Sequence, residues 1–460
     1  MALKTPEEFI QSIADLDLEI YLFGEKVDDY VNHPVIRPSL NCIAMTYELA
    51  RQPEYEDLML ATSHLTGTKV NRFTHIHQST EDLVKKVKMQ RLLGQKTGSC
   101  FQRCVGMDAI NALWSVTHDT DQAKGTDYHE RFKKYVLFLQ ENDLVADGAM
   151  TDPKGDRSKS PSQQADPDMY LHVVEKRDDG IVVRGAKAHQ TGSCNSHEIM
   201  VMPTIAMRPG DEDYAVSFST PSNAKGISYI YGRQSCDTRK LEGNELDVGN
   251  SRFGGHEALM VFDDVFVPWD RVYMCGEIEF SGSLVERFGG YHRQSYGGCK
   301  VGVGDVLIGA ASLAAEYNGA AKASHVKDKI IEMTHLTRRS SRAASLAPPR
   351  GTRPPPATTR STCCWRTSAS RTSRASPTRS RVWPRTSPAA SWSPCRRPRT
   401  SPARRPARWS RSTLSASATR RSSTACASCA SSRTSRSAPP PWVTAPRACT
   451  APARRRHSAS

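Results

Sequence analysis

The chain has 460 residues, of which 38% are hydrophobic and 24% charged, and this length is enough for roughly two or three domains. The net charge of +15 comes from one segment, because the residues from Ser340 onward hold 25 of the 63 basic side chains, all Arg, and none of the 48 acidic ones. The 38 basic residues before Ser340 therefore stand against 48 acidic ones, and this balance of −10 removes the usual reason to expect a nucleic-acid partner.

The first segment of the chain, residues 1–145, has the apolar spacing of helices. Apolar side chains recur at intervals of three to four residues in 109–117 and in 132–139. Glycine is sparse in this segment and helix formers are common. We therefore expect an N-terminal helical domain over 1–145.

The middle of the chain, residues 146–279, changes to the period of two that is typical of strands. Segments 170–175 and 181–184 flank an Asp-Asp-Gly turn, which predicts a β-hairpin. Further strands are expected at 199–202, 214–219 and 259–262. This segment is expected to form a β-rich domain.

Helical spacing returns over residues 280–338, which predicts the start of a C-terminal helical domain. The sequence as a whole thus predicts an α+β fold with a β domain between two helical domains. That order fits the acyl-CoA dehydrogenase architecture, in which a flavin lies in the cleft between the domains. Order alone is weak evidence, because many multi-domain enzymes share it.

The last segment, residues 339–460, does not have the composition of a folding sequence. Asn, Gln, Ile, Met, Phe and Tyr vanish after Ser340, and Arg, Ser, Ala, Pro and Thr dominate. One interpretation is a disordered basic tail that binds nucleic acid. The other is a frameshift, since GC-rich coding DNA read out of frame yields this mixture.

The genetic code favours the frameshift. Residues 357–373 can be encoded by DNA that, one frame over, reads GNYEVDLLLANVCKQNV, a string with ordinary composition and helical spacing. Residues 442–453 can likewise hide VGYRTESMHGAG. We therefore expect the reading frame to break near Arg338 and the residues after it to be disordered.

Neither a secretion signal nor a membrane span is expected. The N-terminus lacks a charged-then-apolar segment and no apolar run looks long enough to cross a bilayer, so we expect a cytoplasmic protein. The 13 cysteines have irregular spacing, which does not suit a disulfide scaffold. Most should be buried and inert; those before the tail are Cys42, Cys100, Cys104, Cys194, Cys236, Cys275 and Cys299.

Two separate stretches carry possible metal donors. Cys100 and Cys104 are four residues apart, so that both sulfurs would project from one face if the segment were helical. His292 and Cys299 are seven apart, which is two turns of one helix or the span of a Gly-rich loop. Three thiolates and an imidazole suit zinc or a [4Fe–4S] cluster, and residue types do not choose between them. Taken alone, the Cys pair is more often two core residues.

Several strings around these donors resemble 4-hydroxybutyryl-CoA dehydratase. The likeness runs from the N-terminus to about Thr337 and resumes in the shifted frame of the tail. It rests on the Cys and His spacings and on FQRCVGMD at 101–108, HVV at 172–174, AHQTG at 188–192 and FGGHE at 253–257.

The resemblance implies two cofactors, FAD and a [4Fe–4S] cluster held by Cys100, Cys104, Cys299 and His292. It also implies that the polar loop 150–157 and the segment 188–193 contact the flavin, although either could otherwise be an ordinary surface turn. The expected flavin contacts are Met150, Thr151, Arg157, His189, Gln190 and Thr191.

The implied reactions are dehydration of 4-hydroxybutyryl-CoA to crotonyl-CoA and isomerisation of vinylacetyl-CoA to crotonyl-CoA. A base removes the α-proton and flavin takes one electron, which makes the β-hydrogen of the resulting radical acidic; the electron returns after the hydroxyl leaves. The resemblance makes His292 the candidate base and Glu257 an acid–base or orienting group. Tyr296 and Lys300 would bind the leaving hydroxyl or the thioester.

Plainer interpretations stay open for these side chains. His292 could be an ordinary hydrogen-bonded histidine, Glu257 a surface ion pair and Lys300 a solvated charge. A further glutamate of the family, in TESMH, exists only in the shifted frame, and Arg447 holds its place in the chain as written. We therefore expect the chain as written to be inactive and poorly folded.

An alternative enzyme class is an FAD-dependent aromatic monooxygenase of the 4-hydroxyphenylacetate type, which shares the fold but has no need of four cluster ligands. For the dehydratase, the expected partners are an acyl-CoA substrate and three further copies of the chain in a homotetramer. No nucleic acid and no membrane are expected as partners.

Overall fold

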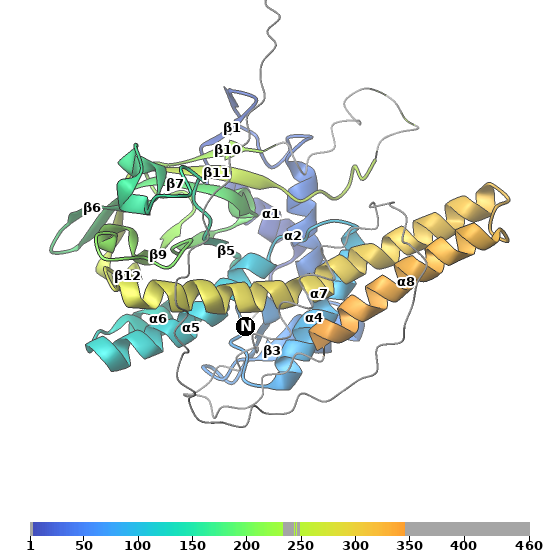
Figure 1. Ribbon diagram of the computed structural model, residues 1–460, viewed down its shortest axis with the longest axis horizontal. Coiled ribbons are helices and arrows are strands. Elements are labelled where there is room, and N and C mark those ends of the chain that lie inside the picture. Colours follow the sequence, from blue (N-terminus) through green and yellow to red (C-terminus); the bar gives the residue numbers. More distant parts are fainter. Residues whose placement is uncertain (1–2, 233–242, 244, 246–248, 346–460) are drawn as a thin grey trace, which may run out of the picture. The chain divides into compact units, whose positions relative to one another are not determined.

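The computed structural model describes residues 3–232, 243, 245 and 249–345, coloured along the chain in Figure 1. The Arg-rich segment from 346 onward lies outside the described residues, as does Cys236. The expectation of a disordered tail and the expectation that Cys236 is buried and inert therefore stay predictions.

The N-terminal part contains the expected helices. Their bounds are α1 Pro6–Ala14, α2 Arg37–Ala50, α3 Glu56–Met59, α4 Thr80–Thr97, α5 Cys104–Lys124 and α6 Tyr128–Glu141. Local sequence sets several of their ends: Ser79 and Asp82 form a capping box at the start of α4, and Gly98, with φ +60°, ends it. Gly125, with φ +71°, ends α5 in the same way.

Strands form one larger and one smaller sheet. The six-stranded sheet has the order β2-β1-β10-β11-β7-β6, and the four-stranded sheet β12-β9-β8-β5. Their bounds are β1 Ile20–Leu22, β2 Glu25–Lys26, β5 Ala146–Ala149, β6 His172–Lys176, β7 Gly180–Thr191, β8 Glu198–Val201, β9 Val216–Pro221, β10 Ile227–Tyr231, β11 Glu257–Pro268 and β12 Val272–Cys275. A separate pair joins β3 Leu60–Thr62 to β4 Lys69–Asn71.

The predicted hairpin is confirmed, because β6 and β7 pair antiparallel across the Asp-Asp-Gly turn. The strands expected at 199–202, 214–219 and 259–262 correspond to β8, β9 and β11. The expectation of an entirely helical N-terminal segment needs correction: β1 and β2 join the large sheet, where β1 runs parallel to β10. A strand of three residues is too short to show a period of two.

One apolar core joins the two sheets to α1 and α2. It includes Phe9, Tyr47, Phe218, Tyr229 and Phe262, each at most 1% exposed. A second core lies among α5, α6, β12 and the long helix α7, Ile278–Tyr317. The helical and β-rich parts are therefore packed together through buried apolar side chains rather than joined by a loop alone.

Helix α7 packs closely against α4, and farther along it packs against α8, Ser324–Ser345 (Figure 1). Glycines make the approach to α4 possible. A Cβ on Gly298 would lie 2.6 Å from the Val87 carbonyl oxygen, and a Cβ on Gly302 would lie 2.2 Å from that of Arg91. From the other side, a Cβ on Gly94 would lie 2.6 Å from the Cys299 carbonyl oxygen. Bare backbone at these positions brings the two helices into contact.

Helix α7 also differs from the expectation that no apolar run could cross a bilayer. Within the described part of the chain, it is long and apolar enough by length and composition, with an 18-residue window of mean hydropathy 1.4 that is 22% buried. A core helix passes the same test. Its exposed apolar side chains gather in the second half: Val306, Leu307, Leu313 and Tyr317.

Candidate active site

The three candidate cysteines come from two places. Cys104 is the first residue of α5, Cys299 lies in α7, and Cys100 precedes α5 in an extended loop. The idea that Cys100 and Cys104 share a helical face is therefore wrong. Gly98 turns the chain out of α4, and Gln102, with φ +71°, cannot continue a right-handed helix.

The three thiols are near enough to influence one another's ionisation. Burial raises the pKa of Cys299 to about 12, and the neighbouring Cys100 adds to the shift. Burial also raises the pKa of Cys104 well above its ordinary value, with further contributions from Cys100 and Cys299. Positive charge acts against this effect only weakly: Lys86 lowers the pKa of Cys104, and Lys300 lowers that of Cys299. Three thiols gathered with so little positive charge would ionise on binding a metal centre, which supplies that charge.

No group of three His, Cys, Asp or Glu side chains within the described ranges lies close enough to hold a single metal ion. A [4Fe–4S] cubane makes a different demand, because each protein ligand bonds its own iron and the donor atoms stand farther apart. Three thiols and one imidazole are donor types that such a cluster accepts.

His292 is held on three sides. Its Nδ1 lies 3.0 Å from Oδ2 of Asp108, a fully buried carboxylate on α5. Its ring stacks on Phe288, with centroids 5.3 Å apart, and meets Tyr296 edge-on at 4.9 Å. Because Phe288 and Tyr296 lie one turn before and after His292 on α7, the helix itself fixes the ring.

Asp108 is the centre of a buried polar cluster that joins α4, α5 and α7. Lys86 on α4 donates to Oδ1 at 2.6 Å, and neither side chain of this pair is exposed. Ser295 on α7 donates to Oδ2 at 2.9 Å. Burial alone would raise the pKa of Asp108, but Lys86 and then His292 outweigh it, so the pKa lies below its usual value. The carboxylate is thus kept ionised inside the protein.

The segments expected to contact flavin are brought together by backbone and side-chain hydrogen bonds. The carbonyl oxygen of Thr151 accepts from the amide N–H of Ala188 at 2.8 Å and from Nε2 of Gln190 at 2.6 Å. Lys187 forms a buried ion pair with Asp152 at 2.7 Å, both 2% exposed. The same ammonium donates to the carbonyl oxygens of Met150 and Met202, which locks the loop onto the end of β7.

The remaining residues expected to contact flavin lie at the end of β7 and in the loop that begins at Met150. His189 is 58% exposed, has φ +60° and lies with Nδ1 3.5 Å from Oε2 of Glu257. Thr191 pairs with Glu257 across β7 and β11. Arg157 is exposed in the loop that begins at Met150.

Glu257 also connects the two halves of the candidate site. Its charge raises the pKa of Cys100, although burial is the larger cause and Lys300 acts against both. The ammonium of Lys300 lies 5.9 Å from the centre of the Tyr296 ring. Glu257 and Lys300 therefore both lie near Cys100, and Glu257 also lies near His189.

Comparison with known proteins decides the family. Residues 5–274 match the N-terminal domain of 4-hydroxyphenylacetate 3-hydroxylase, and residues 281–348 match its C-terminal domain. Over 335 residues the chain is 67% identical to the 4-hydroxybutyryl-CoA dehydratase/vinylacetyl-CoA-Δ-isomerase of Clostridium aminobutyricum, a match that covers 73% of this chain and 68% of the relative. The chain belongs to the 4-hydroxybutyryl-CoA dehydratase family.

Solved structures agree with this membership. A 4-hydroxybutyryl-CoA dehydratase from N. maritimus superposes with a TM-score of 0.73 at 55% identity, over 75% of this chain and 69% of that one. The oxygenase component of 4-hydroxyphenylacetate 3-monooxygenase, solved with FAD, superposes with a TM-score of 0.67 at 24% identity, over 80% of this chain and 75% of that one. At that identity the second likeness shows the shared mixed fold alone.

The dehydratase-family motif FGGHE has a local structural explanation. Its second glycine, Gly255, donates its N–H to Oγ of Ser99 at 3.0 Å, and a Cβ there would lie 2.9 Å from that of Cys100. His256 is fully buried, stacks on Tyr231 and has a pKa lowered to about 3 by burial. The motif therefore packs a glycine against the cysteine loop and buries a neutral histidine behind it.

Sequence reasoning missed Lys86, Asp108 and Ser295. Asp108 closes the string FQRCVGMD and lies one helical turn after Cys104, so that spacing was the available signal. Lys86 is 22 residues earlier and offers no pattern, because only the fold brings the two charges together.

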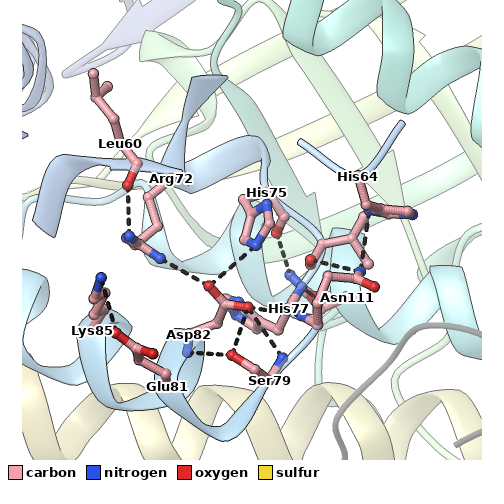
Figure 2. A network of polar contacts seen from close by, with 12 residues as sticks. Leu60, His64, Arg72, His75, His77, Ser79, Glu81, Asp82, Lys85 and Asn111 are labelled. Carbon is pink, nitrogen blue, oxygen red and sulfur yellow. Dashed lines mark hydrogen bonds and ion pairs between the residues drawn. The ribbon is translucent and has the colours of Figure 1, made fainter. Parts of the chain in front are cut away.

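A second polar network fixes the start of α4, the helix that carries Lys86 (Figure 2). Arg72 and His75 both approach Oδ1 of Asp82 at 3.3 Å, and Arg72 also donates to the Leu60 carbonyl oxygen at 2.6 Å. Although burial favours the neutral acid, the hydrogen bond from His75 holds the pKa of Asp82 well below its usual range. Lys86 follows one turn after this anchored carboxylate.

Proposed function

We propose that this chain, when followed by the C-terminal sequence of the shifted frame, converts 4-hydroxybutyryl-CoA to crotonyl-CoA and isomerises vinylacetyl-CoA to crotonyl-CoA. The observation that carries the proposal is the 67% identity to the dehydratase/isomerase of Clostridium aminobutyricum over 335 residues. Its candidate residues also gather in one region, since Cys100 is electrostatically linked to Cys104, Cys299, Glu257 and Lys300.

The cofactors of the proposal are FAD and a [4Fe–4S] cluster. The match to the 4-hydroxyphenylacetate 3-hydroxylase family model and the FAD-bound structure of the 4-hydroxyphenylacetate 3-monooxygenase oxygenase component support the first, and the cluster fits the collected thiols, which lack a counter-charge of their own. When bound, the flavin would supply one-electron transfer and the cluster Lewis acidity toward the leaving hydroxyl. Cys100, Cys104, Cys299 and His292 would hold the cluster.

The flavin would lie against the loop at Met150 and Thr151 and the end of β7 at His189, Gln190 and Thr191, with Arg157 within reach of its phosphates. The loop is suited to this task because the buried Lys187–Asp152 pair holds its backbone in place.

His292 is proposed as the base that takes the α-proton. With Nδ1 hydrogen-bonded to Asp108, the proton would arrive at Nε2, and the carboxylate would stabilise the imidazolium that forms. Glu257 would orient the substrate or handle the second proton from the flavin side. Tyr296 and Lys300 would bind the hydroxyl or thioester near Cys299.

The tail enters the proposal as a lesion. The family's TESMH glutamate is absent from the chain as written, where Arg447 stands, and the match to the family ends by residue 348. We infer that the gene as written gives an inactive polypeptide, and that a homotetramer forms only from the restored chain.

The test compares two genes, the sequence as written and one returned to the other frame after the codon for Arg338. Both proteins are purified without oxygen, their flavin and iron are measured, and crotonyl-CoA formation from 4-hydroxybutyryl-CoA is followed. We expect activity only from the restored chain. A restored chain that holds flavin and iron but forms no crotonyl-CoA would overturn the proposal. Flavin without iron, together with hydroxylation of a phenol, would favour the monooxygenase alternative.

A further inference from the structure

The buried cluster around Asp108 lies next to two proposed cluster ligands, and the role of its other members, Lys86 and Ser295, is still open. Asp108 is on the same face of α5 as Cys104, four residues earlier, and it bonds directly to His292. Two of the groups that contact its oxygens in the described structure are donors, Lys86 and Ser295, and the third is the ring nitrogen Nδ1 of His292.

The acceptor character of Asp108 fixes the tautomer of His292. An ionised carboxylate accepts hydrogen bonds only, so the Nδ1 that faces Oδ2 at 3.0 Å must carry a hydrogen. In the neutral imidazole the lone pair then lies on Nε2. Phe288 and Tyr296 hold the ring against rotation, so that the direction of this lone pair is fixed as well.

Lys86 sets how strongly the carboxylate acts on the ring. A carboxylate behind a metal-bound histidine normally raises the basicity of the imidazole and strengthens the bond to the metal. Here the same carboxylate neutralises a fully buried ammonium 2.6 Å away. Sharing its charge makes Asp108 a weaker acceptor from His292 than an unpaired carboxylate would be, so Lys86 moderates the basicity that Asp108 gives the ring.

We propose that Asp108, paired with Lys86, is the positioning residue that keeps the hydrogen of His292 on Nδ1 and leaves Nε2, in a fixed direction, as the atom that would bind the proposed cluster. The inference rests on the proposed function, because it assumes that His292 is a cluster ligand. Lys86 also donates to the carbonyl oxygen of Tyr291 at 3.1 Å, which joins the ion pair to the backbone of α7 beside His292.

The test is Asp108→Asn in the restored full chain, loaded with iron and sulfide without oxygen. Two properties are measured: the rate at which a chelator removes iron, and the Mössbauer or EPR signature of the cluster. We expect about 10-fold or faster iron loss, the size typical of a lost outer partner of a metal ligand, and a changed signature of the His-bound iron.

Asp305→Asn is the matched control. Asp305 also forms an ion pair between α7 and α4, with Arg91 at 2.7 Å, but its side chain is 23% exposed and contacts no proposed ligand. This variant should lose iron within about 2-fold of the parent rate and keep its signature. A purely structural effect of breaking an α4–α7 pair would instead appear in both variants.

Should Asp108→Asn fail to fold, the double variant Lys86→Gln/Asp108→Asn leaves no unpaired charge in the core and removes the same constraint on the ring. An unchanged iron-loss rate and signature in the variant that folds would overturn the inference. A parent chain that takes up no iron would instead overturn the proposed cluster itself.

Discussion

The buried pair of Lys187 and Asp152 gives the sharpest stability prediction. Both side chains are 2% exposed, and the ammonium serves three acceptors: Asp152 at 2.7 Å and the carbonyl oxygens of Met202 at 2.8 Å and Met150 at 3.1 Å. Burial lowers the pKa of Lys187 and raises that of Asp152, which means that the folded protein bears a desolvation cost for both charges.

Lys187→Met removes the cation but leaves the carboxylate and two carbonyls buried. Loss of one partner of such a pair typically costs about 3–5 kcal/mol, which corresponds to a fall in melting temperature of roughly 5–15 °C. The double variant Lys187→Met/Asp152→Leu removes both charges, and we expect most of the lost stability to return. Thermal unfolding followed by circular dichroism measures both.

Flavin content provides a second measurement on the same variants. Because Lys187 fixes the carbonyl of Met150, we expect the single variant to bind FAD more weakly than the parent. A loss of less than 1 kcal/mol in Lys187→Met, or a double variant no more stable than the single one, would refute the reasoning about a costly buried pair.

The remaining predictions concern pH and helix contact. Burial raises the pKa of Asp147 from its usual value to about 7, and no side chain in the described part of the chain hydrogen-bonds its carboxyl group. The folded state therefore holds a proton that the unfolded state releases from about pH 4 upward, so the free energy of unfolding falls as pH rises toward 7. Asp147→Asn should remove this fall. In urea titrations at pH 8 the variant should be more stable than the parent by about 4 kcal/mol. An identical pH profile in parent and variant would show that Asp147 is ionised in the folded protein. Gly298→Ala should push α7 away from Val87 and lower both the melting temperature and the iron content, because its Cβ would lie 2.6 Å from a carbonyl oxygen. Gly309→Ala is the control on the same helix, where a Cβ meets nothing within 4 Å, and it should stabilise by about 0.5–1 kcal/mol; equal effects of the two substitutions would contradict the role given to the close contact.

Much of the fold followed from local sequence. The Asp-Asp-Gly turn and the period-two segments on either side predicted the β6–β7 hairpin, and the apolar spacing predicted α5, α6 and α7. The pairing of β1 with β10 could not be predicted in the same way. The partners Ile20 and Tyr229 are about 200 residues apart, and three residues carry too little pattern to identify a strand.

The candidate site, like the fold, could be predicted from the sequence only in part. The proposed ligands came from their spacing and from a family resemblance, whereas the loop conformation at Cys100 depends on the positive φ of Gln102, an uncommon state for that residue type. The role of Asp108 was invisible because a buried charge is recognised by its partners, and Lys86 reaches it only through the packing of α4 on α5 and α7.

The 40 residues of α7 join the proposed cluster ligands to an exposed apolar surface. His292 and Cys299 lie in the half of this helix that is packed against α4, while Val306, Leu307 and Leu313 are between 40% and 47% exposed farther along the same rod. Only seven residues, about 10 Å of helix, separate Cys299 from Val306. Aggregation through that exposed apolar surface would thus distort the helical turns that carry His292 and Cys299. We therefore expect preparations of this polypeptide with low solubility also to retain little iron.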